Sequence, residues 1–151
     1  MRELKATFDA IDMIVKSCDI DYGELKEKPI DASLLSEYSN QRIVNSFLFN
    51  FIKIQDKIGA KLFKKILYAL KEIDDFSVPM KDVLHILEKL NIIRTADDWE
   101  RLREVRNALA HEYPMDIPER LENIALALRG YEIIRDIYGD LKKYAVAENI
   151  V

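Results

Sequence analysis

The chain has 151 residues, of which 49% are apolar and 33% charged, a balance typical of one globular domain with a single core. Only four glycines and four prolines occur, which disfavours collagen-like, linker-rich and many-turned all-β architectures and favours an all-α fold. The net charge of −4 lacks the basic excess of a non-specific nucleic-acid binder, so any contact with nucleic acid must be local.

The cellular location expected from the sequence is cytoplasmic. The one cysteine, Cys18, cannot close a disulfide within the chain and suits a reducing compartment. No uninterrupted apolar run approaches the roughly 18 residues that a membrane span needs, so neither export nor membrane insertion is expected.

The first predicted element is an amphipathic helix, because apolar residues recur there at helical spacing. This helix is expected to end near Cys18. Residues 19–32 carry Asp21, Gly23 and Pro29 without a clear apolar period, so they are predicted to form a connecting loop. The apolar face of the helix consists of Leu4, Phe8, Ile11 and Val15.

A long apolar stripe begins near Ser33 or Ser39 and predicts the central helix of the fold. Several lysines punctuate it, as expected of a solvated face whose long stems cover apolar neighbours. Gly59 within the stripe costs roughly 1 kcal/mol relative to alanine in an exposed helix, so it indicates either a bend or a close helix contact. The stripe consists of Val44, Phe47, Phe51, Ile54, Ile58, Leu62, Ile66 and Ala69.

Two further helices are marked by their start signals. Ser77 followed by Pro79 begins one helix, and Asn91 ends it. Thr95, with Asp98 three positions later, fits a capping box, in which side-chain oxygens accept hydrogen bonds from unpaired amides at the start of the next helix. The apolar faces of these helices are Val83, Leu84, Leu87 and Leu90, and then Trp99, Leu102, Val105 and Leu109.

The last helix is predicted to begin at residues 116–119, where the same kind of start signal recurs. Residues 146–151 are expected to form a frayed tail. With no strand pattern or internal repeat, the chain is predicted to be one helical domain, residues 1–151, with about five helices. The buried face of the last helix is expected to consist of Ile117, Leu121, Ile124, Leu128, Tyr131, Ile134, Ile137, Leu141 and Tyr144.

Motifs for nucleotide hydrolysis and metal catalysis are absent from the sequence. The glycines lie too far apart to form a phosphate-binding loop, and the two histidines belong to no metal-binding pair on a helix. We therefore expect no metal and no cofactor. His85 lies among apolar residues and is expected to be a packed or half-exposed neutral imidazole.

The segment from Trp99 to Pro114 differs from the rest, because its helix has a second ordered face beside the apolar one. Arg106 and His111 bracket that face. Five positions apart, they point about 140° from each other around an ideal helix and cannot both grip one small ligand from a single chain. Either the helix unwinds near His111, or a second copy faces it across a twofold axis, with the contact centred near the small Ala110. The second face holds Arg103, Asn107 and Ala110.

A cleft shared by two such helices suits metal-free cleavage of RNA by its own 2′-hydroxyl group. That reaction needs a base, an acid and positive charge on the phosphate. Imidazole titrates near neutral pH, so His111 of one copy can accept a proton while that of the other donates one. Arg106 can hold two phosphate oxygens in a planar fork, and Asn107 can orient the ring or touch a phosphate. Local RNA binding would come from Arg103 and its neighbours.

A second interpretation assigns no chemistry to these residues. An arginine and a histidine on the polar side of a helix also occur on any solvated surface, with Arg106 paired to an acid and His111 favoured by the helix dipole. The spacing alone does not decide between the two interpretations.

The motif itself resembles a known family. Arg106, Asn107, three further residues and His111 resemble the Arg-x4-6-His motif of the HEPN superfamily, in which a polar residue often follows the arginine. His111, Glu112 and Tyr113 complete the Arg-x4-His-x-Tyr form of HepT-like toxins, which are encoded beside an antitoxin of the minimal nucleotidyltransferase (MNT) type. The run FNFIKIQDKIGAKLF and the helix from Pro79 to Asn91 also look like that group, so the resemblance covers most of residues 34–145.

The resemblance implies a HEPN-like helical bundle that forms a twofold homodimer and acts as a metal-independent toxin ribonuclease. Arg106 and His111 would be catalytic and Asn107 supporting. The antitoxin would silence the enzyme by transferring AMP from ATP to Tyr113, since the added phosphate and base compete for Arg106 and obstruct RNA. Without the resemblance, Tyr113 is interpreted as an aromatic residue that packs at a helix end.

HEPN domains also serve as inactive scaffolds and as substrate-binding companions of nucleotidyltransferases, and the same fold hosts both roles. The alternative function is therefore a non-catalytic helical module that partners a minimal nucleotidyltransferase. Because the acidic residues Glu100, Glu104 and Glu112 surround the motif, a restricted RNA target is expected of the ribonuclease rather than indiscriminate digestion.

Overall fold

A computed structural model of the chain describes residues 2–110 and 116–151 and confirms the all-α fold class, with no strand in these two ranges. With α3, η1 and α4 counted as one continuous helix, this part of the chain contains six helices, one more than the five expected. The elements are α1 (Arg2–Lys26), α2 (Ser33–Ser36), α3 (Tyr38–Lys57), the π-helical segment η1 (Ile58–Leu62), α4 (Phe63–Ala69), α5 (Met80–Lys89), α6 (Ala96–Ala110) and α7 (Ile117–Ala147).

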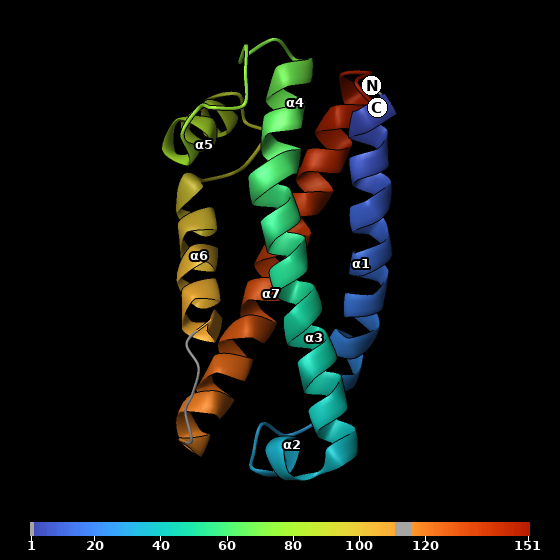
Figure 1. Ribbon diagram of the computed structural model, residues 1–151, viewed down its shortest axis with the longest axis vertical. Helices are drawn as coiled ribbons and strands as arrows, with labels where there is room; N and C mark the ends of the chain where they lie inside the picture. The colour runs from blue at the N-terminus through green and yellow to red at the C-terminus, as the bar shows by residue number, and fades with distance from the viewer. Residues whose placement is uncertain (1, 111–115) are drawn as a thin grey trace.

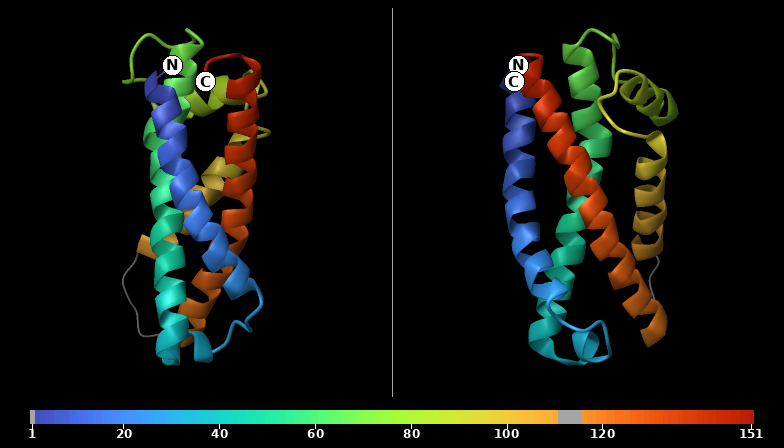
Figure 2. Two further views of the ribbon diagram at one scale, coloured as in Figure 1. Left: turned by 90° about the vertical axis from the view of Figure 1, so that its right-hand side faces the viewer. Right: turned by 180° about the vertical axis from the view of Figure 1, so that it is seen from behind.

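Three long helices run the length of the molecule and form its body. Helix α1, the continuous α3–η1–α4 helix and α7 pack against one another. Helix α6 packs against α7 on the side of the bundle away from α1 (Figures 1 and 2). The short helix α5 lies at the end of the bundle where α4 ends and both chain termini meet, and α2 lies at the opposite end. The buried apolar residues of all these helices form one core.

Helix α1 is longer than the sequence analysis predicted. It continues past Cys18 to Lys26, so the predicted loop over residues 19–32 is wrong for its first part. The reason is that Cys18, Tyr22 and Leu25 extend the apolar face at the same three- and four-residue spacing, and all are buried. Gly23 lies within this helix but contacts no neighbour, because nothing lies within 4 Å of the position that its Cβ would take.

The helix ends use left-handed residues without glycine. Lys71, Asn91 and Asn149 each have a positive φ directly after a helix C-cap. In each case the amide of this residue and the amide of the next residue donate back to carbonyls of the last turn, which is the Schellman arrangement. The prediction that Asn91 ends its helix is confirmed. The frayed tail at 146–151 is wrong, because Ile150 donates to the Ala145 carbonyl and packs against the core.

The predicted helix starts are largely confirmed. The hydroxyl of Thr95 accepts a hydrogen bond from the amide of Asp97 at the start of α6, and Asp116 accepts one from the amide of Glu119 at the start of α7. The other half of the predicted capping box is not formed, because Asp98 pairs with Arg101 instead. Helix α5 begins one residue after Pro79. One burial prediction is wrong, because Ile117 is 45% exposed at the very start of α7. His85 is exposed on α5, which excludes the packed option that the sequence left open for it.

Polar contacts between α1 and α7 repeat every seven residues. Tyr138 donates to Asp12 at 2.6 Å, and Lys142 pairs with the same carboxylate at 2.7 Å. One heptad earlier on α7, Tyr131 and Arg135 contact Asp19 in the same way. Because the helices run antiparallel, later residues of α7 meet earlier residues of α1, and these contacts set the register of the pair.

None of the described helices has the length and apolar character required to cross a membrane.

Candidate functional site

Arg106 is held by an acid from another helix. Its Nε lies 2.7 Å from Oδ1 of Asp56, and its Nη2 lies 3.0 Å from Oδ2, so the two groups form a bidentate pair between α6 and α3. Such planar pairs fix the orientation of the guanidinium as well as its position. Both side chains stay accessible, at 36% exposure for Arg106 and 49% for Asp56.

The packing of α6 against the π turn places Arg106 opposite Asp56. Trp99, in the first turn of α6, lies so close to Gly59 that a Cβ there would be 2.9 Å from Cζ2 of the indole. The ring of Phe63 meets the indole edge-on, with centroids 4.7 Å apart. Arg106 follows Trp99 by about two turns, and Asp56 precedes Gly59 by about one. The close contact expected as one option at Gly59 is therefore present, within a π-helical segment.

The contact with Asp56 leaves part of the guanidinium available. Arginine has five N–H donors, and Asp56 uses one on Nε and one on Nη2. The outer edge, formed by Nη1 and the other N–H of Nη2, has no hydrogen-bond partner among the described residues. This edge is a second fork of the kind that holds two phosphate oxygens. Arg106 is thus oriented by one edge and open to an anion at the other.

The same contact favours the charged form of Arg106. The hydrogen bonds to Asp56 raise the pKa of the guanidinium above its ordinary value, outweighing its slight burial. Any arginine is cationic at physiological pH, so the contact matters for the orientation of the group rather than for its charge.

Two other site residues predicted from the sequence, Arg103 and Asn107, lie near Arg106 on the exposed surface of α6. Arg103 is exposed and contacts both carboxylate oxygens of Glu100 at 3.3 Å. Asn107 is exposed and makes no hydrogen bond within the described part of the chain. Both lie near Arg106, but Arg103 shares its charge with a neighbouring acid, so it offers RNA less than an unpaired arginine would.

The remaining predicted site residues, His111 and Tyr113, lie outside the described residues, as does Pro114. The described part of the site is thus Arg103, Arg106 and Asn107. Within residues 2–110 and 116–151, no group of three histidine, cysteine, aspartate or glutamate side chains is placed to hold a metal ion.

Asp56 is a site residue that sequence reasoning missed. It lies 50 positions before Arg106, and nothing in the local sequence marks it out among the many acids of this chain. The available signal was the position of Asp56 on the predicted central helix. It lies about one turn before Gly59, and a close contact with another helix was one of the two options expected at Gly59.

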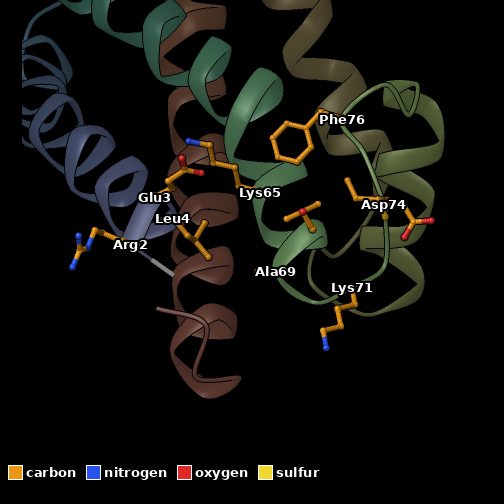
Figure 3. Close-up of a pocket in the computed structure, with 10 residues that line it drawn as sticks. Arg2, Glu3, Leu4, Lys65, Ala69, Lys71, Asp74 and Phe76 are labelled. Atoms are coloured by element: carbon orange, nitrogen blue, oxygen red, sulfur yellow. The ribbon is translucent and has the colours of Figure 1, made fainter.

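A separate hollow of about 760 Å³ lies at the far end of the bundle, where α1 begins and α4 ends (Figure 3). Charges of both signs line it, and the side chain of Lys71 points away from the others. None of the site residues predicted from the sequence belongs to it. Its lining includes Arg2, Glu3, Leu4, Lys65, Asp74 and Phe76.

Comparisons with protein-family models, with curated proteins and with solved structures found no match to this chain. The functional assignment therefore depends on the residues of the site itself.

Proposed function

We propose that this chain is the toxin ribonuclease of a HEPN/MNT toxin–antitoxin pair, a homodimer that cleaves RNA without a metal. The observation that carries the proposal is the guanidinium of Arg106, which Asp56 orients through one edge while the outer edge stays open. A preoriented cation beside a developing charge lowers a reaction barrier without reorganising at the moment of reaction. The sequence supplies Asn107 and His111 next to it.

The proposed reaction uses the RNA as its own nucleophile. An imidazole of His111 removes the proton of a 2′-hydroxyl, and the 2′-oxygen attacks the adjacent phosphorus. The bond from phosphorus to the 5′-oxygen breaks, and the imidazolium of His111 from the second copy protonates that oxygen. The outer edge of Arg106 holds the phosphate oxygens as their charge grows. The products are a 2′,3′-cyclic phosphate and a 5′-hydroxyl.

The proposal uses two copies, because the two side chains of one regular helix point too far apart to reach the same phosphate, and a second copy supplies the missing partner. In the proposed homodimer, α6 of each copy faces the other near Ala110, which is exposed and small. The cleft between the copies would then hold two arginines and two histidines.

Growth of cells that express the protein without an antitoxin tests this proposal. We expect the wild type to arrest growth, and the variants Arg106→Ala and His111→Ala to be harmless while remaining dimeric. Cleavage of RNA by the purified proteins should follow the same order. Equal harmlessness of all three proteins, with the dimer intact, would contradict the catalytic role.

Silencing by AMP transfer to Tyr113 is a separate part of the proposal. The hydroxyl of Tyr113 would attack the α-phosphorus of ATP, and pyrophosphate would leave. The intact mass of the protein co-expressed with its antitoxin should show added AMP units, and Tyr113→Phe should remove them. An unchanged mass after co-expression would reject this modification.

The alternative function is a non-catalytic module that partners a minimal nucleotidyltransferase. One observation favours it: the carboxylate of Asp56 already engages Arg106, as it would on an ordinary helical surface. Incubation of the pure protein with RNA separates the two functions. A complete lack of products, with and without a chelator, would favour the module.

A further inference from the structure

The outer face of α3 is a continuous exposed surface that leads to Arg106. Figure 1 shows α3 in front of α7, with α1 on one side, α6 on the other and no described helix covering its front. The residues on this face follow one another at three- and four-residue spacing, and all of them are exposed. They are Tyr38, Arg42, Asn45, Phe49, Lys53, Asp56 and Ala60, which we call the α3 stripe.

Two aromatic rings stand out on the α3 stripe. Tyr38 is 74% exposed and Phe49 is 65% exposed, so both rings offer a face to solvent. Each carries a cation from the next turn of the helix: Arg42 lies 6.0 Å from the centre of the Tyr38 ring, and Lys53 lies 5.5 Å from that of Phe49. The stripe therefore contains the same unit twice, a ring that can stack with a base and a cation beside it.

The charge of the stripe opposes that of the whole chain. Neither Arg42 nor Lys53 has an ion-pair partner among the described residues. The only acid on the stripe is Asp56, whose carboxylate is engaged by Arg106. A positive path in a chain with a net charge of −4 is the local basic contact that an acidic nucleic-acid binder needs.

The spacing along α3 suits an extended ligand. With a rise of 1.5 Å per residue, the two rings are about 16 Å apart, and Phe49 is about 10 Å from Asp56. A flexible strand laid along the helix would thus meet a ring, a cation, a second ring and a second cation before it reaches the guanidinium of Arg106.

We propose that single-stranded RNA binds along the α3 stripe, with bases stacked on Tyr38 and Phe49 and phosphates at Arg42 and Lys53, and that this path delivers the scissile phosphate to Arg106. The inference rests on the proposed ribonuclease function. A protein partner fits the stripe less well, because it would have to supply an acid for each of the two cations that it removes from water, whereas an RNA strand carries a phosphate at every nucleotide.

Binding of a fluorescent single-stranded RNA with 2′-O-methyl groups tests the path without cleavage, because that RNA lacks the attacking hydroxyl. We expect Tyr38→Ala and Phe49→Ala each to weaken binding about tenfold, since each removes a ring on which one base stacks. Affinity falls as salt concentration rises, and Arg42→Gln and Lys53→Gln should each make the slope of log affinity against log salt less steep by about 0.7. The matched control is Tyr68→Ala, which removes an aromatic ring that is 54% exposed on α4, and it should leave binding unchanged.

The possible outcomes separate this inference from the proposed function. Binding that depends on the stripe, in a protein that cleaves no RNA, would support the path and reject the ribonuclease. Cleavage and binding that are insensitive to all four stripe variants would reject the path alone. If Phe49→Ala instead changes the oligomeric mass and leaves RNA affinity unaltered, the stripe is a contact between copies and the inference is wrong. A wild-type protein that binds no RNA would reject it as well.

Discussion

At the scale of single residues, the candidate site centres on the guanidinium of Arg106, which contacts Asp56 through one edge and leaves the other edge open. The sequence pointed to Arg106 through its spacing from His111, because a motif is local and can be found by inspection. It could not point to Asp56, since a pair formed between α3 and α6 depends on how two helices pack. The pair itself, half exposed to solvent, adds no more than about 1 kcal/mol to folding, so its main effect is orientation.

The substitution Asp56→Asn should separate orientation from folding. We expect the free energy of unfolding to fall by about 1 kcal/mol or less. RNA cleavage should fall about 10- to 100-fold, because a misplaced cation no longer meets the transition state. Glu100→Gln, which removes the acid paired with Arg103, is the matched control and should cleave at nearly the wild-type rate. Wild-type cleavage by Asp56→Asn would show that the pair does not position Arg106.

The neighbouring residue Gln55 carries a cost in stability. Its side chain is only 2% exposed, and its Oε1 accepts no hydrogen bond from the described residues. A buried acceptor without a partner costs about 1–3 kcal/mol, so Gln55→Met should raise the free energy of unfolding by about 1 kcal/mol. Denaturant titration measures this difference. A loss of stability would indicate that the amide has a partner outside the described residues.

At the scale of elements, the π turn and the indole of Trp99 fix where α6 lies. The sequence left a bend or a close contact open at Gly59, and only the fold shows which helix approaches it. The length of α1 was underestimated for a related reason. Asp19, Asp21 and Gly23 suggested a loop, but burial of Tyr22 and Leu25 outweighs their low helix propensity.

Substitution of Gly59 by alanine should destabilise the protein, although alanine favours a helix. Gly59→Ala gains about 1 kcal/mol of helix propensity but pushes a methyl group into the indole, so we expect a net loss of about 1–3 kcal/mol. Gly139→Ala is the control, because nothing lies within 4 Å of its added Cβ, and it should stabilise the protein slightly. Thermal unfolding of both variants measures the contrast. Equal shifts would mean that α6 moves aside at little cost.

The contacts between α1 and α7 should make stability depend on pH. Burial alone would raise the pKa of Asp12, but hydrogen bonds from Lys142 and Tyr138 outweigh it and lower the pKa. A carboxylate with a lowered pKa stabilises the fold above its unfolded pKa of about 4, and this contribution is lost as pH falls through the folded value. Asp12→Asn should therefore cost about 1 kcal/mol at pH 7 and much less near pH 3.

The control for this pH dependence is Asp9→Asn, which removes an exposed partner of Lys5 on the same helix. It should change the unfolding curve little at either pH. A cost for Asp12→Asn that is equal at pH 7 and pH 3 would contradict the assignment of the effect to ionisation.

At the scale of the whole molecule, the all-helical class and most helix starts were predictable, because they depend on local spacing and capping residues. Their arrangement was not. The left-handed caps at Lys71 and Asn149, and the contacts that repeat every seven residues between α1 and α7, became visible only in the fold. The twofold dimer stays a prediction, as do the roles of His111 and Tyr113.

The chemistry of RNA cleavage tests the central claim most directly. The measurement is the digestion of a labelled RNA, with chelator present, by the wild type, Arg106→Ala and His111→Ala, with a second RNA carrying a 2′-deoxy group at the cleaved position. We predict that only the wild type cuts, that its products end in a 2′,3′-cyclic phosphate, and that the 2′-deoxy RNA stays intact. Equal cleavage by all three proteins, or no cleavage by any of them, would contradict the account.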